Sequence, residues 1–163
     1  MIDRLWAPWR IDYIKAPKEE GCIFCDKPKS NNDRESLILY RGPSAFVLMN
    51  LYPYNNGHLM SVPYSHESDP LNIDSNTKSE IMEIADRSME ILKRVMNPQG
   101  FNFGANIGEA GGAGIADHLH YHIVPRWGGD TNFMPVLGHT KTVVEGLEET
   151  YDSLKPEFDK IDA

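Results

Sequence analysis

The segment at residues 117–126 constrains the fold more than any other part of the sequence, because histidine alternates there with apolar residues. Side chains of a β-strand point alternately to its two faces, so this segment predicts a strand with His118, His120 and His122 on one face. In a dry interior these imidazoles would each need hydrogen-bond partners, so we expect their face to line a polar cleft or to hold a metal. The alternative interpretation is three structural histidines with satisfied hydrogen bonds.

The bulk composition narrows the class of protein. A chain of 163 residues fits one domain with one core. The formal charge of -8 argues against a general binder of nucleic-acid polymers or anionic membranes, although a small anion can still bind in a locally basic cleft. The sequence lacks an apolar run of the roughly 20 residues that a membrane helix needs, and its first residues lack the apolar region of a signal peptide. We therefore expect a cytoplasmic protein.

The two cysteines of the chain, Cys22 and Cys25, have C-x-x-C spacing. This spacing allows either a redox pair or half of a metal site. A redox pair of the thioredoxin kind would need a βαβ context, which the flanking sequence does not suggest. A metal site would need two more ligands, which the six histidines could supply. Two small buried thiols remain the third interpretation.

Short strand-like segments separated by turn residues predict an antiparallel sheet of about five strands. The expected strands are at residues 37–40, 45–50, 58–62, 101–107 and 117–126. Between the third and fourth strands, residues 77–96 have the apolar spacing of an amphipathic helix, with Thr77 and Glu80 at the spacing of a capping box. A second apolar stripe predicts a C-terminal helix within residues 140–163. The fold class is therefore α+β.

Two further segments are suggestive. Residues 1–20 are rich in tryptophan and read as an arm that docks on its own domain or on a second subunit. Residues 108–114 contain four glycines directly before the histidine strand. Glycines allow backbone N–H groups to converge on an anion, although they also simply permit tight turns. Beside neutral imidazoles, which can attack phosphorus, such a loop favours a phosphate site.

These motifs resemble the histidine triad, or HIT, superfamily of nucleotide hydrolases and transferases. The signature of alternating histidines is accompanied, in the family's order, by the Cys22–Cys25 pair, His58, His66 and Asn106. The likeness covers residues 22–126. It continues more specifically at residues 5–10 and 125–130, which are similar to bacterial diadenosine-polyphosphate phosphorylases and hydrolases in the Fhit-like branch.

The resemblance implies a role for each matching residue. His120 would be the nucleophile that forms a nucleotidyl-histidine intermediate, with His122 and Asn106 against the phosphate. The nucleotide would be held by the residues that match the family's binding positions, namely Asn50, His58, Gly112, Gly114 and His118. A structural zinc would be held by the two cysteines and two histidines, namely Cys22, Cys25, His66 and His118. Family members are usually homodimers, so the resemblance also implies a homodimer.

The sequence departs from many members of the family just before the triad. Gly114 and Ile115 stand where a glutamine and then a serine or threonine are common, so a side-chain donor is missing. Substrates with a basic amine leaving group are therefore poorer candidates than polyphosphates, whose leaving groups need little proton assistance. The glycine loop is also about one residue longer than in eukaryotic Fhit proteins.

The sequence therefore predicts one HIT domain over residues 1–163 that cleaves dinucleoside polyphosphates such as diadenosine tetraphosphate, with inorganic phosphate or water as acceptor. Four cations could meet the distal phosphates or be ordinary surface charges: Arg4, Arg10, Arg126 and Lys141. Two alternatives belong to other classes of protein. One is a nucleotide-binding regulatory module whose hydrolysis is slow or incidental. The other is a zinc-organised interaction domain that does not depend on His120.

Overall fold

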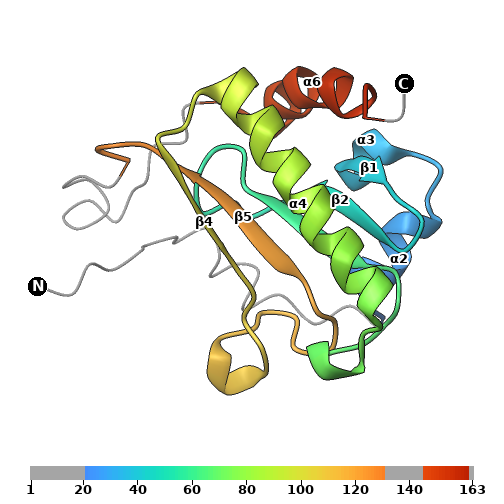
Figure 1. Cartoon of the computed structure of the whole chain (residues 1–163). Helices are drawn as coiled ribbons and strands as arrows, with labels where there is room; N and C mark the ends of the chain where they lie inside the picture. Colours follow the sequence, from blue (N-terminus) through green and yellow to red (C-terminus); the bar gives the residue numbers. More distant parts are fainter. Residues whose placement is uncertain (1–20, 131–144, 162–163) are drawn as a thin grey trace, which may run out of the picture.

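The computed structural model describes residues 21–130 and 145–161. Five antiparallel strands form one sheet in the order β1-β2-β3-β5-β4, with α4 laid across one face and α6 beside α4 (Figure 1). The predicted α+β class and five-stranded sheet are confirmed. The tryptophan-rich arm, Arg4, Arg10 and Lys141 lie outside the described residues.

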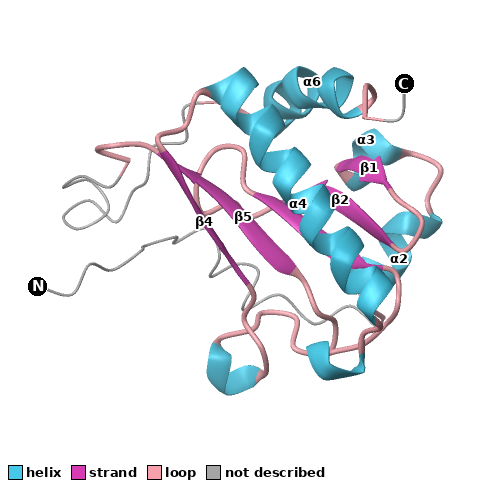
Figure 2. Cartoon of the chain, in the orientation of Figure 1, coloured by secondary structure: helices cyan, strands magenta, loops and turns pink. Residues whose placement is uncertain are grey.

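The strands are short and the helices vary in length (Figure 2). The strands are β1 (Ile38–Arg41), β2 (Ala45–Met49), β3 (Leu59–Pro63), β4 (Gly100–Gly104) and β5 (Tyr121–Arg126). The α-helices are α2 (Ile23–Asp26), α3 (Asp33–Ser36), α4 (Ser75–Met96) and α6 (Leu147–Phe158). Single 3-10 turns are η1 (Lys27–Lys29), η2 (Pro70–Asn72) and η3 (Glu109–Gly111). None of these helices has the length and hydropathy of a membrane span.

The N-terminus of α4 differs from the prediction. Asp74 is the N-cap, and its Oδ1 accepts hydrogen bonds at 3.0 Å from the backbone N–H groups of Asn76 and Thr77. Asp is among the strongest N-cap residues, so the helix begins two residues before Thr77. The carboxylate of Glu80 instead accepts from the backbone N–H of Ser44, at 3.0 and 3.1 Å. The predicted capping box is therefore wrong, and Glu80 anchors the β1–β2 turn.

Two apolar clusters cover the two faces of the sheet. On one face, α4 and α6 pack through their predicted stripes, which include Ile84, Leu92, Leu154 and Phe158. On the other face, Phe24 of α2 packs against residues such as Met60 of β3. Removing these apolar side chains from water provides most of the favourable free energy of folding.

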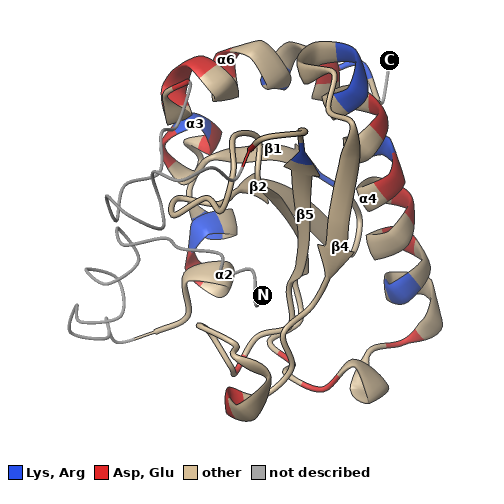
Figure 3. Ribbon diagram, turned by 90° about the vertical axis from the view of Figure 1, so that its left-hand side faces the viewer, with Lys and Arg blue, Asp and Glu red and all other residues tan. Residues whose placement is uncertain are grey.

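Charged residues are unevenly distributed over the fold. Figure 3 shows Asp, Glu, Lys and Arg along α4 and α6, whereas the strands are nearly free of them. The five strands contain two arginines, Arg41 and Arg126, and no acidic residue. The negative charge of the chain is thus largely kept away from the sheet, which makes the sheet the better place for an anionic ligand.

The histidine strand is shorter than predicted, because β5 begins at Tyr121. His118 and His120 precede it, where the backbone N–H of Leu119 donates to the carbonyl oxygen of Glu67 at 2.7 Å. At the other side of the loop, β4 ends at Gly104, so residues 105–107 are not part of the strand. The connection between β4 and β5, residues 105–120, thus contains both the glycine-rich loop and the first two histidines of the triad.

Candidate functional site

The three histidines of the triad lie on the sheet face opposite α4. His122 is paired with Met60 of β3 and Gly104 of β4, and Met60 belongs to the apolar cluster of that face. The rings of His120 and His122 are 5.0 Å apart. His118 and His120 are 1% and 5% exposed, so both rings are buried. Each of these two buried rings must therefore find partners within the protein.

His118 is held in one tautomer by a backbone carbonyl. Its Nε2–H donates to the carbonyl oxygen of Pro63 at 2.9 Å, because a carbonyl can only accept. In the neutral ring Nδ1 is then unprotonated. Burial lowers the pKa of His118 below its ordinary value, and the hydrogen bond to Pro63 opposes this shift only in part. His118 therefore presents a lone pair at Nδ1.

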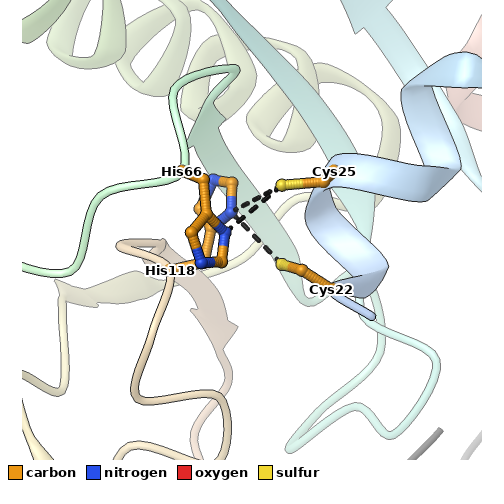
Figure 4. Close-up of side chains that lie close together, drawn as sticks. All are labelled: Cys22, Cys25, His66 and His118. Atoms are coloured by element: carbon orange, nitrogen blue, oxygen red, sulfur yellow. Dashed lines mark hydrogen bonds between the residues drawn. The ribbon is translucent and has the colours of Figure 1, made fainter. Parts of the chain in front are cut away.

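Nδ1 of His118 faces the cysteine pair (Figure 4). It lies 3.3 Å from Sγ of Cys22 and 3.6 Å from Sγ of Cys25, and Nδ1 of His66 lies 3.3 Å from Sγ of Cys25. All four ligand atoms are within 4.8 Å of one another. Four such ligands around a tetrahedral zinc would be separated by about 3.3–3.8 Å. The donor set therefore fits a metal ion of this kind, and the three separations of 3.3, 3.3 and 3.6 Å match a tetrahedral site.

His120 is held in the opposite tautomer. Its Nδ1–H donates at 2.8 Å to the carbonyl oxygen of His118, so the lone pair of the neutral ring is on Nε2. The ring of Phe24 packs against it with a centroid separation of 4.8 Å. A neutral imidazole fixed in this way is a nitrogen nucleophile of defined direction.

A chain of hydrogen bonds determines which ring nitrogen of His122 carries the proton. The backbone N–H of Tyr54 donates to Nδ1 of His58 at 3.0 Å, so neutral His58 carries its proton on Nε2. That Nε2–H donates to Nδ1 of His122 at 2.9 Å. Neutral His122 therefore carries its proton on Nε2, which makes that nitrogen a donor. The ring of Tyr54 stacks on His58 with an interplanar angle of 22°.

A cavity of about 340 Å³ lies beside His122, on the β4–β5 side of the site. Asn106, predicted to contact a phosphate, lines this cavity together with His122. Its other walls include Tyr54, Asn102 and Arg126. Arg126 is paired with Asp130, with an Nε–Oδ2 distance of 2.7 Å.

The remaining predicted residues are placed as follows. Asn50 lies beside His58, with 3.4 Å between its Nδ2 and Nδ1 of His58, and its Oδ1 accepts from the backbone N–H of Tyr52. Gly112 and Gly114 lie in the exposed loop between β4 and β5. Gly112 has a φ of 82°, which favours glycine, and a Cβ there would meet no neighbour. The loop backbone is thus accessible.

Four residues of the site were not predicted from the sequence, namely Phe24, Tyr54, Asn55 and Asn102. Phe24 stands inside the cysteine motif, and Tyr54 and Asn55 stand between the second and third predicted strands, where the sequence has no periodic pattern. Asn102 could have been predicted, because it is four positions before Asn106 in the predicted strand at residues 101–107. Residues at even spacing in a strand point to the same face. Pairing with β5 opposite Val124 sets Asn102 on the face that holds His122.

Comparisons with known proteins identify the family of this chain. The model of the HIT domain matches residues 31–129. The AP-4-A phosphorylase of Mycobacterium tuberculosis is 36% identical over 165 residues, covering 96% of this chain and 85% of that protein.

Solved structures share the fold. A Zn-bound histidine triad family protein from Mycobacterium smegmatis has a TM-score of 0.69 at 20% identity, covering 87% of this chain and 96% of that chain. A hypothetical histidine triad nucleotide-binding protein from Sulfolobus tokodaii has a TM-score of 0.68 at 22% identity, covering 86% and 94%. Since the family model spans more than half of the chain and a relative is 36% identical over 165 residues, the chain belongs to the HIT family, as a hydrolase or nucleotidyltransferase.

Proposed function

We propose that this protein cleaves the polyphosphate bridge of dinucleoside polyphosphates, such as diadenosine tetraphosphate, through a nucleotidyl intermediate on His120. The observation that carries the proposal is the hydrogen bond from Nδ1 of His120 to the carbonyl oxygen of His118, which leaves the lone pair on Nε2. The relative named AP-4-A phosphorylase supports this substrate class.

In the first step, the Nε2 lone pair of His120 attacks the α-phosphorus. A new N–P bond forms, the bond between the α-phosphorus and its bridging oxygen breaks, and the electron pair leaves with that oxygen as nucleoside triphosphate. In the second step, an oxygen of inorganic phosphate or of water attacks the same phosphorus, the N–P bond breaks, and its electron pair returns to Nε2. The proton of the acceptor is released to solvent, so neutral His120 is restored. The relative's name favours phosphate as acceptor.

His122 and Asn106 would contact the phosphate. The Nε2–H of His122 can donate to a phosphate oxygen whose charge rises in the transition state. His58 would act behind it, because its hydrogen bond fixes the proton of His122 at Nε2. The leaving polyphosphate is a weak base, which suits a site that lacks a side-chain donor at Gly114 and Ile115.

The nucleoside attached to the α-phosphorus would be held near Asn50. The family resemblance implies that the side chain of Asn50 binds the ribose hydroxyls. Its Nδ2 lies 3.4 Å from Nδ1 of His58. The accessible loop at Gly112 and Gly114 would offer backbone N–H groups to the phosphate.

We propose that the metal at Cys22, Cys25, His66 and His118 is a structural zinc. Mixed thiolate and imidazole ligands in a closed tetrahedral set are typical of structural zinc. The ion would stabilise the junction of α2, the loop after β3 and the segment before β5. We further propose that residues 1–163 act as one HIT domain and that the protein works in the cytoplasm as a homodimer.

Product analysis tests the proposal. The purified protein is incubated with diadenosine tetraphosphate, with and without inorganic phosphate, and nucleotides are separated by anion exchange. ADP and ATP formed only with phosphate would identify a phosphorylase, whereas AMP and ATP without phosphate would identify a hydrolase. A single-turnover reaction with α-labelled substrate should leave label on the wild-type protein and none on a His120→Ala variant. Binding without cleavage would instead support a regulatory module.

A further inference from the structure

The cavity beside His122 runs along β5 away from the metal-binding residues. His122, Val124 and Arg126 face it from alternate positions of the strand. Arg126 is four positions along the strand from His122, which corresponds to about 13 Å. The volume of about 340 Å³ is at the lower end of small-molecule sites, so the cavity fits one nucleoside-sized group.

The far end of this cavity is electrically neutral. Arg126 donates from Nε to Oδ2 of Asp130 at 2.7 Å and from Nη2 to Oδ1 at 3.0 Å. Its Nη1 donates to Oδ1 of Asn102 at 2.6 Å. This bidentate pair offsets the charge of the guanidinium, and together with the hydrogen bond to Asn102 it engages three of the five N–H groups of Arg126. A polyphosphate chain would therefore gain little at Arg126, contrary to one of the two expectations from the sequence.

Two amides at the same end have fixed orientations. Nδ2 of Asn55 donates to the carbonyl oxygen of Pro125 at 3.0 Å and to Oδ2 of Asp130 at 2.8 Å. Both hydrogens of Nδ2 are thereby used, and Oδ1 of Asn55 remains as an acceptor. Oδ1 of Asn102 accepts from Arg126, so its Nδ2 remains as a donor. Both side chains line the cavity.

A donor and an acceptor beside apolar walls recognise a nucleobase better than a phosphate. Adenine presents an amino donor next to a ring-nitrogen acceptor, which is the complement of one amide oxygen and one amide N–H. Tyr54 and Val124 supply aromatic and aliphatic wall surface. Phosphate oxygens, by contrast, are acceptors only and could not pair with Oδ1 of Asn55.

We propose that the cavity between His122 and Arg126 binds the second nucleoside, the one that departs with the polyphosphate, through Asn55 and Asn102. This inference rests on the proposed function and adds a source of selectivity. The α-phosphorus is at His120 and the departing nucleoside is on the Arg126 side. The enzyme would therefore prefer a dinucleoside polyphosphate to a mononucleoside polyphosphate with the same scissile bond.

The test compares diadenosine tetraphosphate with adenosine 5′-tetraphosphate, which has the same α-phosphorus and lacks the second nucleoside. The preference is the ratio of the two kcat/KM values for the full-length protein. The wild-type protein should prefer the dinucleotide about tenfold or more. In Asn102→Ala this ratio should fall about fivefold, the effect of losing one hydrogen bond. Asn102 is exposed, so this substitution should leave thermal unfolding unchanged.

A matched control is Asn76→Ala, which alters an exposed asparagine on α4, on the opposite side of the sheet. Its ratio should equal that of the wild type. Equal kcat/KM values for the two substrates in the wild type, or an unchanged ratio in Asn102→Ala, would overturn the assignment while leaving the proposed cleavage intact. A higher KM for inorganic phosphate in Asn102→Ala, with an unchanged ratio, would reassign the cavity to the acceptor. If neither substrate is cleaved, the proposed function fails and this inference fails with it.

Discussion

His118 and His120 are two residues apart and both are buried, yet they present opposite ring nitrogens. His118 donates from Nε2 to the carbonyl oxygen of Pro63 and turns Nδ1 toward the cysteines. His120 donates from Nδ1 to the carbonyl oxygen of His118 and keeps its lone pair on Nε2. The position of one backbone carbonyl therefore decides whether a buried histidine offers Nδ1 to a metal or Nε2 to a phosphorus.

The two histidines are also joined through one residue. The side chain of His118 belongs to the proposed metal site, and its carbonyl oxygen orients His120. Any displacement of the His118 backbone would therefore turn the nucleophile. Substitutions at the metal-binding residues should mainly change stability, whereas substitutions around His120 should mainly change the cleavage rate. The two groups of residues remain coupled through this carbonyl.

The largest effect is expected for His120→Asn. The amide Nδ2 of asparagine can replace Nδ1 as donor to the His118 carbonyl, whereas the nucleophilic Nε2 is lost. We expect kcat for diadenosine tetraphosphate to fall by about three to six orders of magnitude. The measurement is single-turnover cleavage, with thermal unfolding as the control for the fold. Labelled nucleotide that still became bound to the variant would show that another residue is the nucleophile.

Substituting a metal-binding residue should mainly affect stability. In Cys22→Ser, bound zinc should fall from about one ion per chain to none, and the free energy of unfolding should fall by several kcal/mol, because metal binding is coupled to folding. A chelator should reproduce this loss in the wild type and have little effect on the variant. Metal analysis and chemical unfolding measure both quantities. Wild-type protein without zinc, purified under reducing conditions with zinc supplied, would contradict the proposed ligand set.

The hydrogen bond between His58 and His122 can be tested by substituting His58. His58→Gln interrupts the hydrogen bond to Nδ1 of His122, so the proton of His122 is no longer fixed at Nε2. We expect kcat to fall about tenfold, which corresponds to about 1.4 kcal/mol of transition-state free energy. The pH profile of kcat should also change, because a purely structural role would leave its shape intact. An unaltered rate and profile would remove His58 from the proposed mechanism.

The sequence predicted the layers of this molecule better than its hydrogen bonds. The alternation at residues 117–126 has a period of two, and the apolar stripe of α4 has a period of 3.6. Both periods can be recognised in the sequence without knowledge of the tertiary structure. The tautomers of His118 and His120 could not be predicted, because they depend on carbonyls of Pro63 and His118 that the fold brings into place.

The same limit applies to the cavity and to the end of α4. The pairing of Arg126 with Asp130 follows from the turn at residues 127–130, whose geometry no periodicity encodes. The capping box failed for a related reason: Thr77 and Glu80 have the right spacing, but Asp74 caps the helix and Glu80 reaches the β1–β2 turn. Local patterns therefore identify candidates, and long-range partners decide among them.

The smallest effect is expected for Tyr151, which packs on the α4 face of the sheet, opposite the triad. The hydroxyl of Tyr151 donates to the carbonyl oxygen of Ile38 at 3.0 Å, so this pair isolates the structural part of such a bond. Tyr151→Phe should lower the free energy of unfolding by about 1 kcal/mol at pH 7 and leave the cleavage rate unchanged.

Alkaline pH sharpens this last comparison. Burial, followed by the nearby carboxylate of Asp33, raises the pKa of Tyr151 from 10.0 to about 12. Between these two values the unfolded chain loses the phenolic proton and the folded chain keeps it, so this contribution to stability falls as pH rises through that window. Denaturant unfolding at pH 7 and near pH 11 should therefore show the wild type losing more stability than Tyr151→Phe. If both proteins lost the same stability, the hydroxyl of Tyr151 would be solvated in the folded protein. Its hydrogen bond to the Ile38 carbonyl would then not retain its proton at alkaline pH.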